Sequence, residues 1–109
     1  MSAAQRYKLV WFVPREALDV TREAVFAAGA GRIGDYERCS WYAMGTGTFL
    51  GGQGTDPAVG QAGTEQRVGE LRVETVVASD LLQAVLDALV AAHPYQEVAY
   101  DVYELVDPR

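Results

Sequence analysis

The alternation of apolar and polar positions along the chain predicts four β-strands. The candidates are residues 7–13, 38–50, 68–78 and 97–105, of which the first and third alternate most clearly. In the first strand the alternation places one group of side chains on one face, namely Tyr7, Leu9, Trp11 and Val13. Val10 and Phe12 then fall on the opposite face, so this strand is apolar on both sides.

Two amphipathic helices are predicted between these strands. In residues 15–28 apolar side chains recur at helical spacing, and Gly29 supplies a C-terminal stop. We expect Ser79 or Asp80 to cap a second helix that ends at His93, because Pro94 cannot continue it. The element order β-α-β-β-α-β predicts a single α+β domain over residues 1–109. Its expected fold is ferredoxin-like, a four-stranded antiparallel sheet with two helices on one face.

Charge and composition exclude several classes of partner. The formal net charge is −6 and the 9 Lys and Arg residues are scattered, so a phosphate backbone would be repelled and no nucleic-acid partner is expected. No apolar run reaches the roughly 20 residues that span a bilayer, and the N-terminus lacks a signal-peptide pattern. We therefore expect a cytoplasmic protein without a membrane partner. The single cysteine, Cys39, cannot form an intramolecular disulfide and is expected to be a small buried side chain.

Apolar residues on both faces of the sheet predict self-association. Two helices can cover only one face, yet the first and last predicted strands are apolar on both sides. An apolar face of this kind is expected to be covered by another copy of the chain. The alternative is that the long loop and the C-terminal tail fold back over it.

A glycine-rich loop lies between the second and third strands. Residues 45–63 contain most of the chain's 11 glycines together with Pro57, and Thr46, Thr48 and Asp56 are its candidate ligand-binding residues. Backbone N–H groups in such a loop could cradle an anion. There is, however, no Lys or Arg between residues 45 and 66 and no phosphate-binding P-loop pattern. The alternative is a connection whose glycines serve turns and bulges.

The corner between the second helix and the last strand holds the only histidine. His93 and Glu97 flank this corner and are the candidate metal ligands, with Tyr95 as a further ligand-binding candidate. Two protein ligands are fewer than the three or four of a zinc site, so such a site could close only across a subunit interface. In the alternative interpretation, His93 closes the last helical turn and hydrogen-bonds a backbone carbonyl or a carboxylate. We assign no metal and no cofactor from the sequence.

Several ordered motifs carry a resemblance to a known family. They are Gly-Ala-Gly-Arg-Ile-Gly-Asp-Tyr at 29–36, Gly-Thr-Gly-Thr-Phe at 45–49, Gly-Thr-Asp-Pro at 54–57, Gly60, Glu-Leu-Arg-Val-Glu-Thr at 70–75 and His-Pro-Tyr-Gln-Glu-Val-Ala-Tyr-Asp at 93–101. With these the chain resembles the insertion domain of the YqfO branch of the NGG-interacting-factor-like proteins, here as a stand-alone copy. That insertion resembles the PII signalling proteins and the CutA proteins. Because those are trimers, the resemblance implies a trimer, with a dimer as the alternative.

The resemblance also bears on function. The metal-binding residues of full-length relatives belong to a flanking domain absent from this chain, and the insertion offers no catalytic residues to carry over. In PII proteins the corresponding loop contacts ligands and partners, which makes residues 45–63 a candidate surface for a small molecule or a protein. We expect a non-enzymatic, oligomeric binding or regulatory module. The alternative is a CutA-like metal-binding protein with His93 and Glu97 at subunit interfaces; an enzyme is disfavoured because no nucleophile and base pair can be named.

Overall fold

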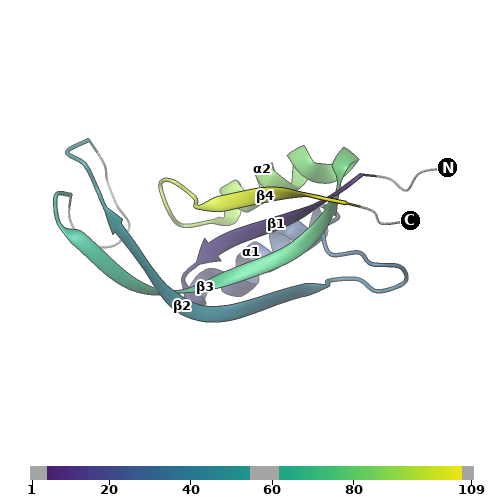
Figure 1. Cartoon of the computed structure of the whole chain (residues 1–109), viewed down its shortest axis with the longest axis horizontal. Coiled ribbons are helices and arrows are strands. Elements are labelled where there is room, and N and C mark those ends of the chain that lie inside the picture. The colour runs from purple at the N-terminus through teal and green to yellow at the C-terminus, as the bar shows by residue number, and fades with distance from the viewer. Residues whose placement is uncertain (1–4, 55–61, 107–109) are drawn as a thin grey trace.

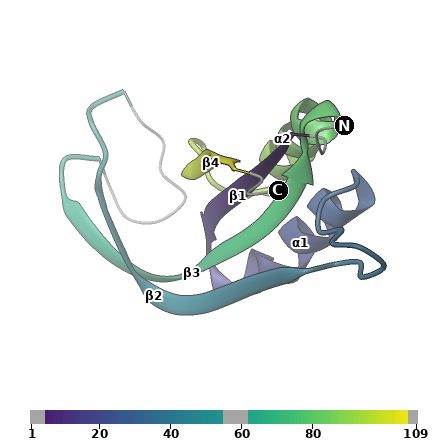
Figure 2. The ribbon, with the colours of Figure 1, turned by 45° about the vertical axis from the view of Figure 1, so that its right-hand side comes forward.

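The computed structural model describes residues 5–54 and 62–106, which form one four-stranded antiparallel sheet and two helices (Figure 1). The strands are β1 (Arg6–Val13), β2 (Ser40–Leu50), β3 (Glu65–Ala78) and β4 (Tyr100–Leu105), and the helices are α1 (Leu18–Ala27) and α2 (Leu82–Ala92). The sheet order is β2-β3-β1-β4. Both helices lie on the same face of the sheet (Figure 2). The ferredoxin-like α+β fold is therefore confirmed.

Several predicted boundaries were wrong for physical reasons. The last strand begins at Tyr100 rather than at residue 97, because β1 ends at Val13 and its pairing with β4 starts at Trp11 opposite Tyr100. β3 starts at Glu65 rather than at residue 68, because its first residues pair with the end of β2. Neither Ser79 nor Asp80 caps α2 with its side chain, since a 3-10 turn over Ser79–Leu81 leads into that helix.

The core lies between the sheet and the two helices. Its members are the inward residues of β1 and β3 with the facing residues of α1 and α2, including Leu9, Trp11, Val13, Val25, Leu71, Val73, Val77, Val85 and Leu89. Trp11 is fully buried, and its indole Nε1–H donates to Thr21 Oγ1 of α1 at 3.1 Å. Burial of these apolar side chains removes each from water and supplies the main stabilisation of the fold. Within the described residues, neither helix is long and apolar enough to cross a bilayer.

β2 and β3 continue past the end of β1 as a two-stranded arm, formed by residues 45–50 and 65–70 (Figure 1). The last pair between β1 and β3 joins Val13 and Leu71, so beyond it the two arm strands pair only with each other. Neither of the two described helices covers this part of the sheet. As a result Leu50 at the end of β2 is 64% exposed.

The helix-free face exposes less apolar surface than the alternation predicts. Val10 is completely buried within the single chain, although it lies on this face. Charged side chains run beside it: Glu74 pairs with Lys8 at 3.7 Å and with Arg72 at 3.1 Å. The aliphatic parts of such side chains shield apolar neighbours while their charged ends reach water. The large apolar side chains that stay exposed on this face are Trp41 and Tyr103.

Candidate functional site

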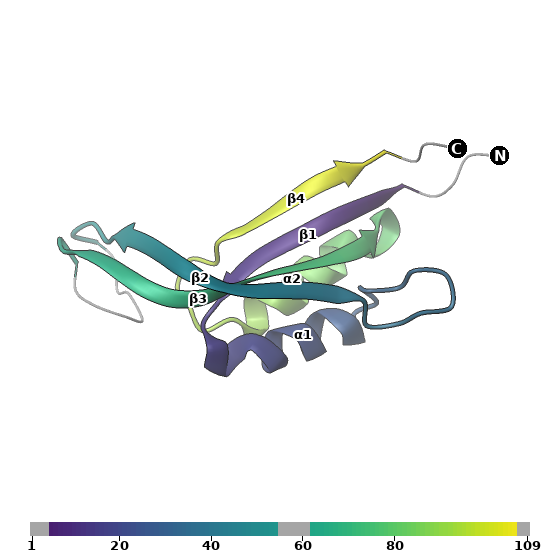
Figure 3. The same cartoon turned by 60° about the horizontal axis from the view of Figure 1, so that its bottom comes forward.

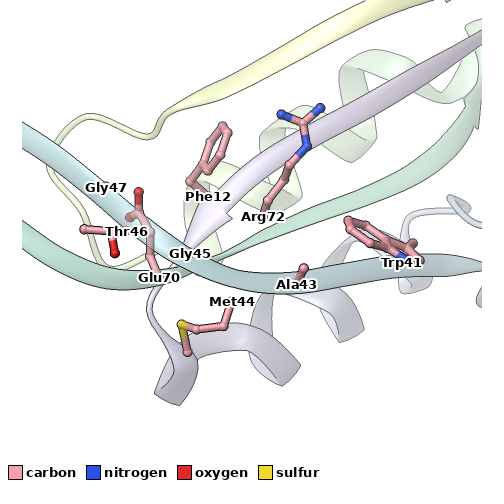
Figure 4. A pocket seen from close by; sticks show the side chains of 9 residues that line it. All are labelled: Phe12, Trp41, Ala43, Met44, Gly45, Thr46, Gly47, Glu70 and Arg72. Atoms are coloured by element: carbon pink, nitrogen blue, oxygen red, sulfur yellow. The ribbon is translucent and has the colours of Figure 1, made fainter.

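A groove of about 330 Å³ opens where the arm leaves the rest of the sheet (Figure 4). Its lining comes from β1, β2 and β3 and consists of Phe12, Trp41, Ala43, Met44, Gly45, Thr46, Gly47, Glu70 and Arg72. The register places most of these residues on the helix-free face. In Figure 4 Phe12, Glu70 and Arg72 lie on one side of the β2 ribbon and Met44 on the other. The groove therefore combines an apolar lining with two charged side chains.

The two charged side chains of the groove differ in how they are compensated. The Arg72 guanidinium is paired with Glu74, and it also lies over the Phe12 ring at 5.8 Å. Glu70 has no cationic partner among the described residues. Its Oε2 accepts a long hydrogen bond of 3.5 Å from the Tyr95 hydroxyl. Burial raises the pKa of the Glu70 carboxyl, while the hydrogen bond from Tyr95 lowers it in part. The uncompensated charge of the groove is thus negative.

Tyr95 and His93 connect this groove to the corner that follows α2. Their rings lie 4.8 Å apart. Burial and the neighbouring Glu70 carboxylate both raise the pKa of Tyr95, since each disfavours a phenolate. The corner thus contacts the groove through Tyr95, although the two segments are separated by a whole helix in the sequence.

His93 is buried at the end of α2, and both of its ring nitrogens are engaged by backbone groups. Nε2 lies 2.6 Å from the Phe12 carbonyl oxygen, and Nδ1 accepts a 3.2 Å hydrogen bond from the Tyr95 N–H. This pattern requires a neutral ring that carries its proton on Nε2. Burial lowers the pKa of His93, and the hydrogen bond to Phe12 raises it in part. The expected hydrogen bond to a backbone carbonyl is present, but the acceptor belongs to β1 rather than to α2.

The structure brings together some of the residues predicted from the sequence and separates others. His93 and Tyr95 contact each other, and Thr46 lies on the groove that Tyr95 reaches through Glu70. Thr48 is exposed on the arm opposite Arg67, and Glu97 is exposed in the corner. Asp56 lies outside the described residues. Among the described residues there is no cluster of three or more His, Cys, Asp or Glu side chains suited to a metal ion.

Of the nine residues that line the groove, sequence reasoning named only Thr46 as a candidate ligand-binding residue. Phe12 was expected only on an apolar face covered by another copy, and Glu70 and Arg72 were assigned no binding role. The signal for the last two was the outward position of successive charged residues on β3. It could not show that Glu70 meets Tyr95, because the contact depends on where the corner crosses the end of the sheet.

Gly47 allows Glu70 to reach its position, and this leads to a testable prediction. A Cβ added at Gly47 would overlap the Glu70 carboxylate, whereas a Cβ at Gly45 meets nothing within 4 Å. We expect Gly47→Ala to displace this carboxylate and lower the pKa of Tyr95, because Glu70 contributes to raising it. NMR titration of ring-labelled tyrosine measures that pKa. Gly45→Ala is the matched control and leaves the pKa unchanged; equal titration in both variants would contradict the contact.

The fold defines the class of protein to which this chain is similar. CutA from Synechococcus elongatus superposes with a TM-score of 0.68 at 18% identity, covering 97% of this chain and 81% of CutA. The GlnK–ATP complex of Bacillus subtilis superposes with a TM-score of 0.63 at 13% identity, covering 95% of this chain and 86% of GlnK. At these identities the likeness concerns the fold, which is that of CutA and PII proteins.

Closer similarity is found to segments of longer proteins. The chain is 52% identical over 106 residues to the GTP cyclohydrolase 1 type 2 homolog of Mycobacterium bovis, an alignment that covers 97% of this chain and 28% of the relative. A Bacillus cereus protein related to NIF3 superposes with a TM-score of 0.86 at 42% identity, covering 98% of this chain and 27% of that protein. The chain thus spans little more than a quarter of these relatives' length. No protein-family model matches it.

Proposed function

We propose that this chain is a non-catalytic, self-associating binding or regulatory module with the fold of CutA and PII proteins. The similarity to one segment of the NIF3-related proteins supports its correspondence to the YqfO-type insertion domain. The activity named in those relatives belongs to much longer proteins and is not part of the proposal. We place the module in the cytoplasm, and the groove at the base of the arm is its binding surface.

The observation that carries self-association is the long exposed edge of the sheet. β2 is an edge strand of 11 residues, and nearly all of its side chains are exposed. Trp41, Met44 and Leu50 are large apolar residues on this single strand, and Trp41 is 58% exposed. An edge of this length and composition offers unpaired backbone groups beside apolar side chains, a combination that monomers normally avoid. In the proposed assembly, another copy pairs with these backbone groups and covers these apolar side chains.

The arrangement of reactive side chains supports a binding role over catalysis. Cys39 is half-buried, where the sequence predicted full burial, and its Sγ lies 3.9 Å from the Glu37 carbonyl oxygen. The ring nitrogens of His93 are already bonded to backbone groups, so neither is free to act as a base for a nucleophile. The same two bonds argue against His93 as a metal ligand, because a ligating nitrogen would have to give up its present partner.

Self-association makes a direct prediction for the size of the protein in solution. Analytical ultracentrifugation at micromolar concentrations is expected to show a species larger than the 11.8 kDa chain. We expect three copies, with two as the alternative. A species of one chain at every concentration would contradict the proposal. Trp41→Ser tests the surface involved, since it removes exposed apolar area from β2 without touching the core and should shift the protein towards monomer.

A further inference from the structure

The corner, defined as residues 93–99, holds one of the groove residues by its backbone. It follows α2 and curves around the end of β1 (Figure 3). The Phe12 N–H donates to the Ala99 carbonyl oxygen at 3.1 Å, and the Phe12 carbonyl oxygen lies 2.6 Å from His93 Nε2. The side chain of Phe12 lines the groove. Its position in the groove therefore depends on the corner.

The corner also holds the Glu70 carboxylate. The Tyr95 hydroxyl donates to Glu70 Oε2 at 3.5 Å. The carboxylate fills the space that Gly47 leaves by lacking a Cβ, and in Figure 4 the Glu70 side chain extends towards Gly47. Tyr95 is bound in turn to His93, because its backbone N–H donates to His93 Nδ1 at 3.2 Å. Glu70 is thus linked to His93 through Tyr95.

The two hydrogen bonds of His93 respond differently to protonation of its ring. The neutral ring donates from Nε2 to the Phe12 carbonyl and accepts at Nδ1 from the Tyr95 N–H. A charged ring carries a proton on both nitrogens. It still donates to Phe12, but its Nδ1–H then faces the Tyr95 N–H, and two donors cannot bond each other. Protonation therefore breaks the contact with Tyr95 and keeps the contact with Phe12.

Carboxylates lie around Tyr95, but among the described residues none of them pairs with the His93 ring. Burial, Glu70 of β3 and Glu16 of the 3-10 turn that precedes α1 all raise the pKa of Tyr95. Glu97 is exposed in the corner itself. Burial lowers the pKa of His93, and the hydrogen bond to the β1 carbonyl raises it in part. The ring is therefore neutral at neutral pH and takes its second proton in acid.

We propose that the corner is a pH-dependent switch for the groove. With His93 neutral, Tyr95 holds the Glu70 carboxylate over Gly47. When the ring takes a second proton, Tyr95 moves away and Glu70 is free to turn towards an occupant of the groove. Phe12 stays in place, because the charged ring still donates to its carbonyl. This inference rests on the proposed binding role of the groove and concerns the regulation of that same surface.

An NMR titration of ¹⁵N-labelled protein tests the switch. As His93 takes its second proton below about pH 6.5, we expect the Tyr95 amide to shift in step with the ring. Its protection against hydrogen exchange should fall by about tenfold, while the amide of Val10, in the middle of β1, does not respond. His93→Phe should show the released Tyr95 amide at every pH. Glu97→Gln removes an exposed carboxylate of the same corner and is the matched control, expected to titrate as wild type does.

Glu70→Gln removes the other group of this contact that titrates in acid. We expect the Tyr95 transition to persist in this variant; if it disappears, Glu70 drives the change and the switch is wrong. The switch is also wrong if the Tyr95 amide stays unchanged while His93 is protonated, or if the ring stays neutral until circular dichroism shows the fold unfolding. If His93→Phe does not fold, the wild-type and Glu70→Gln titrations decide. These results leave the proposed function standing, whereas a monomer in ultracentrifugation contradicts the proposed self-association and leaves the switch.

Discussion

Trp11→Ala is expected to lower the free energy of unfolding by about 4 kcal/mol, the cost of truncating a large buried aromatic side chain. Trp11 is the largest fully buried side chain of the described residues, and it lies on the helix-facing side of β1. Its removal leaves a cavity between sheet and helices and takes away the hydrogen bond that Thr21 accepts from the indole. Because small domains are stable by only about 5–15 kcal/mol, this loss removes between about a quarter and four fifths of the margin.

The second tryptophan provides the matched control for that experiment. Trp41→Ala makes the same chemical change at a side chain that is 58% exposed on the edge strand β2. Urea unfolding at two protein concentrations separates the two effects, because loss of assembly depends on concentration and loss of core packing does not. We expect a concentration-independent loss for Trp11→Ala alone. Equal losses for both variants would contradict the assignment of Trp11 to the core.

The fold could be predicted because its core elements obey simple periods. In β1, Leu9, Trp11 and Val13 all face the helices as the period of two requires. In α2, Val85 and Leu89 lie four residues apart and are both fully buried. Pro94 ends this helix as expected, since α2 stops at Ala92. Local patterns of this kind depend on neighbours in the sequence, so the sequence alone can reveal them.

The groove depends on contacts between distant segments, which no local pattern encodes. Tyr95 and Glu70 are 25 residues apart in the sequence, and His93 meets the Phe12 carbonyl across 81 residues. Both contacts require knowing that the corner after α2 crosses the end of β1. The same limitation applies to Val10, whose burial on the helix-free face depends on side chains contributed by the strands beside β1. The sequence could thus identify candidate residues by their chemical type, but only the folded structure shows which residues they contact.

His93→Phe is expected to lower the free energy of unfolding by about 2 kcal/mol near neutral pH, since it leaves two backbone groups without their partners. The ring is similar in size but can neither donate to the Phe12 carbonyl nor accept from the Tyr95 N–H. Both hydrogen bonds hold the corner against the end of β1. Chemical denaturation of the two proteins, repeated across a range of pH, measures the difference.

The cost of His93→Phe should also depend on pH, and the sign follows from the pKa. Burial lowers the pKa of His93 in the folded protein below its ordinary value of about 6.5, so the unfolded chain binds the proton more tightly. The stabilisation by His93 is complete above about pH 6.5 and is lost as the pH falls through the folded-state pKa. The difference between wild type and His93→Phe should therefore shrink in acid. Tyr95→Phe serves as the control. Because it keeps the His93 imidazole, the stabilisation by His93 should depend on pH in this variant as it does in wild type. A difference that stayed constant down to acidic pH would show that His93 is not held neutral between Phe12 and Tyr95.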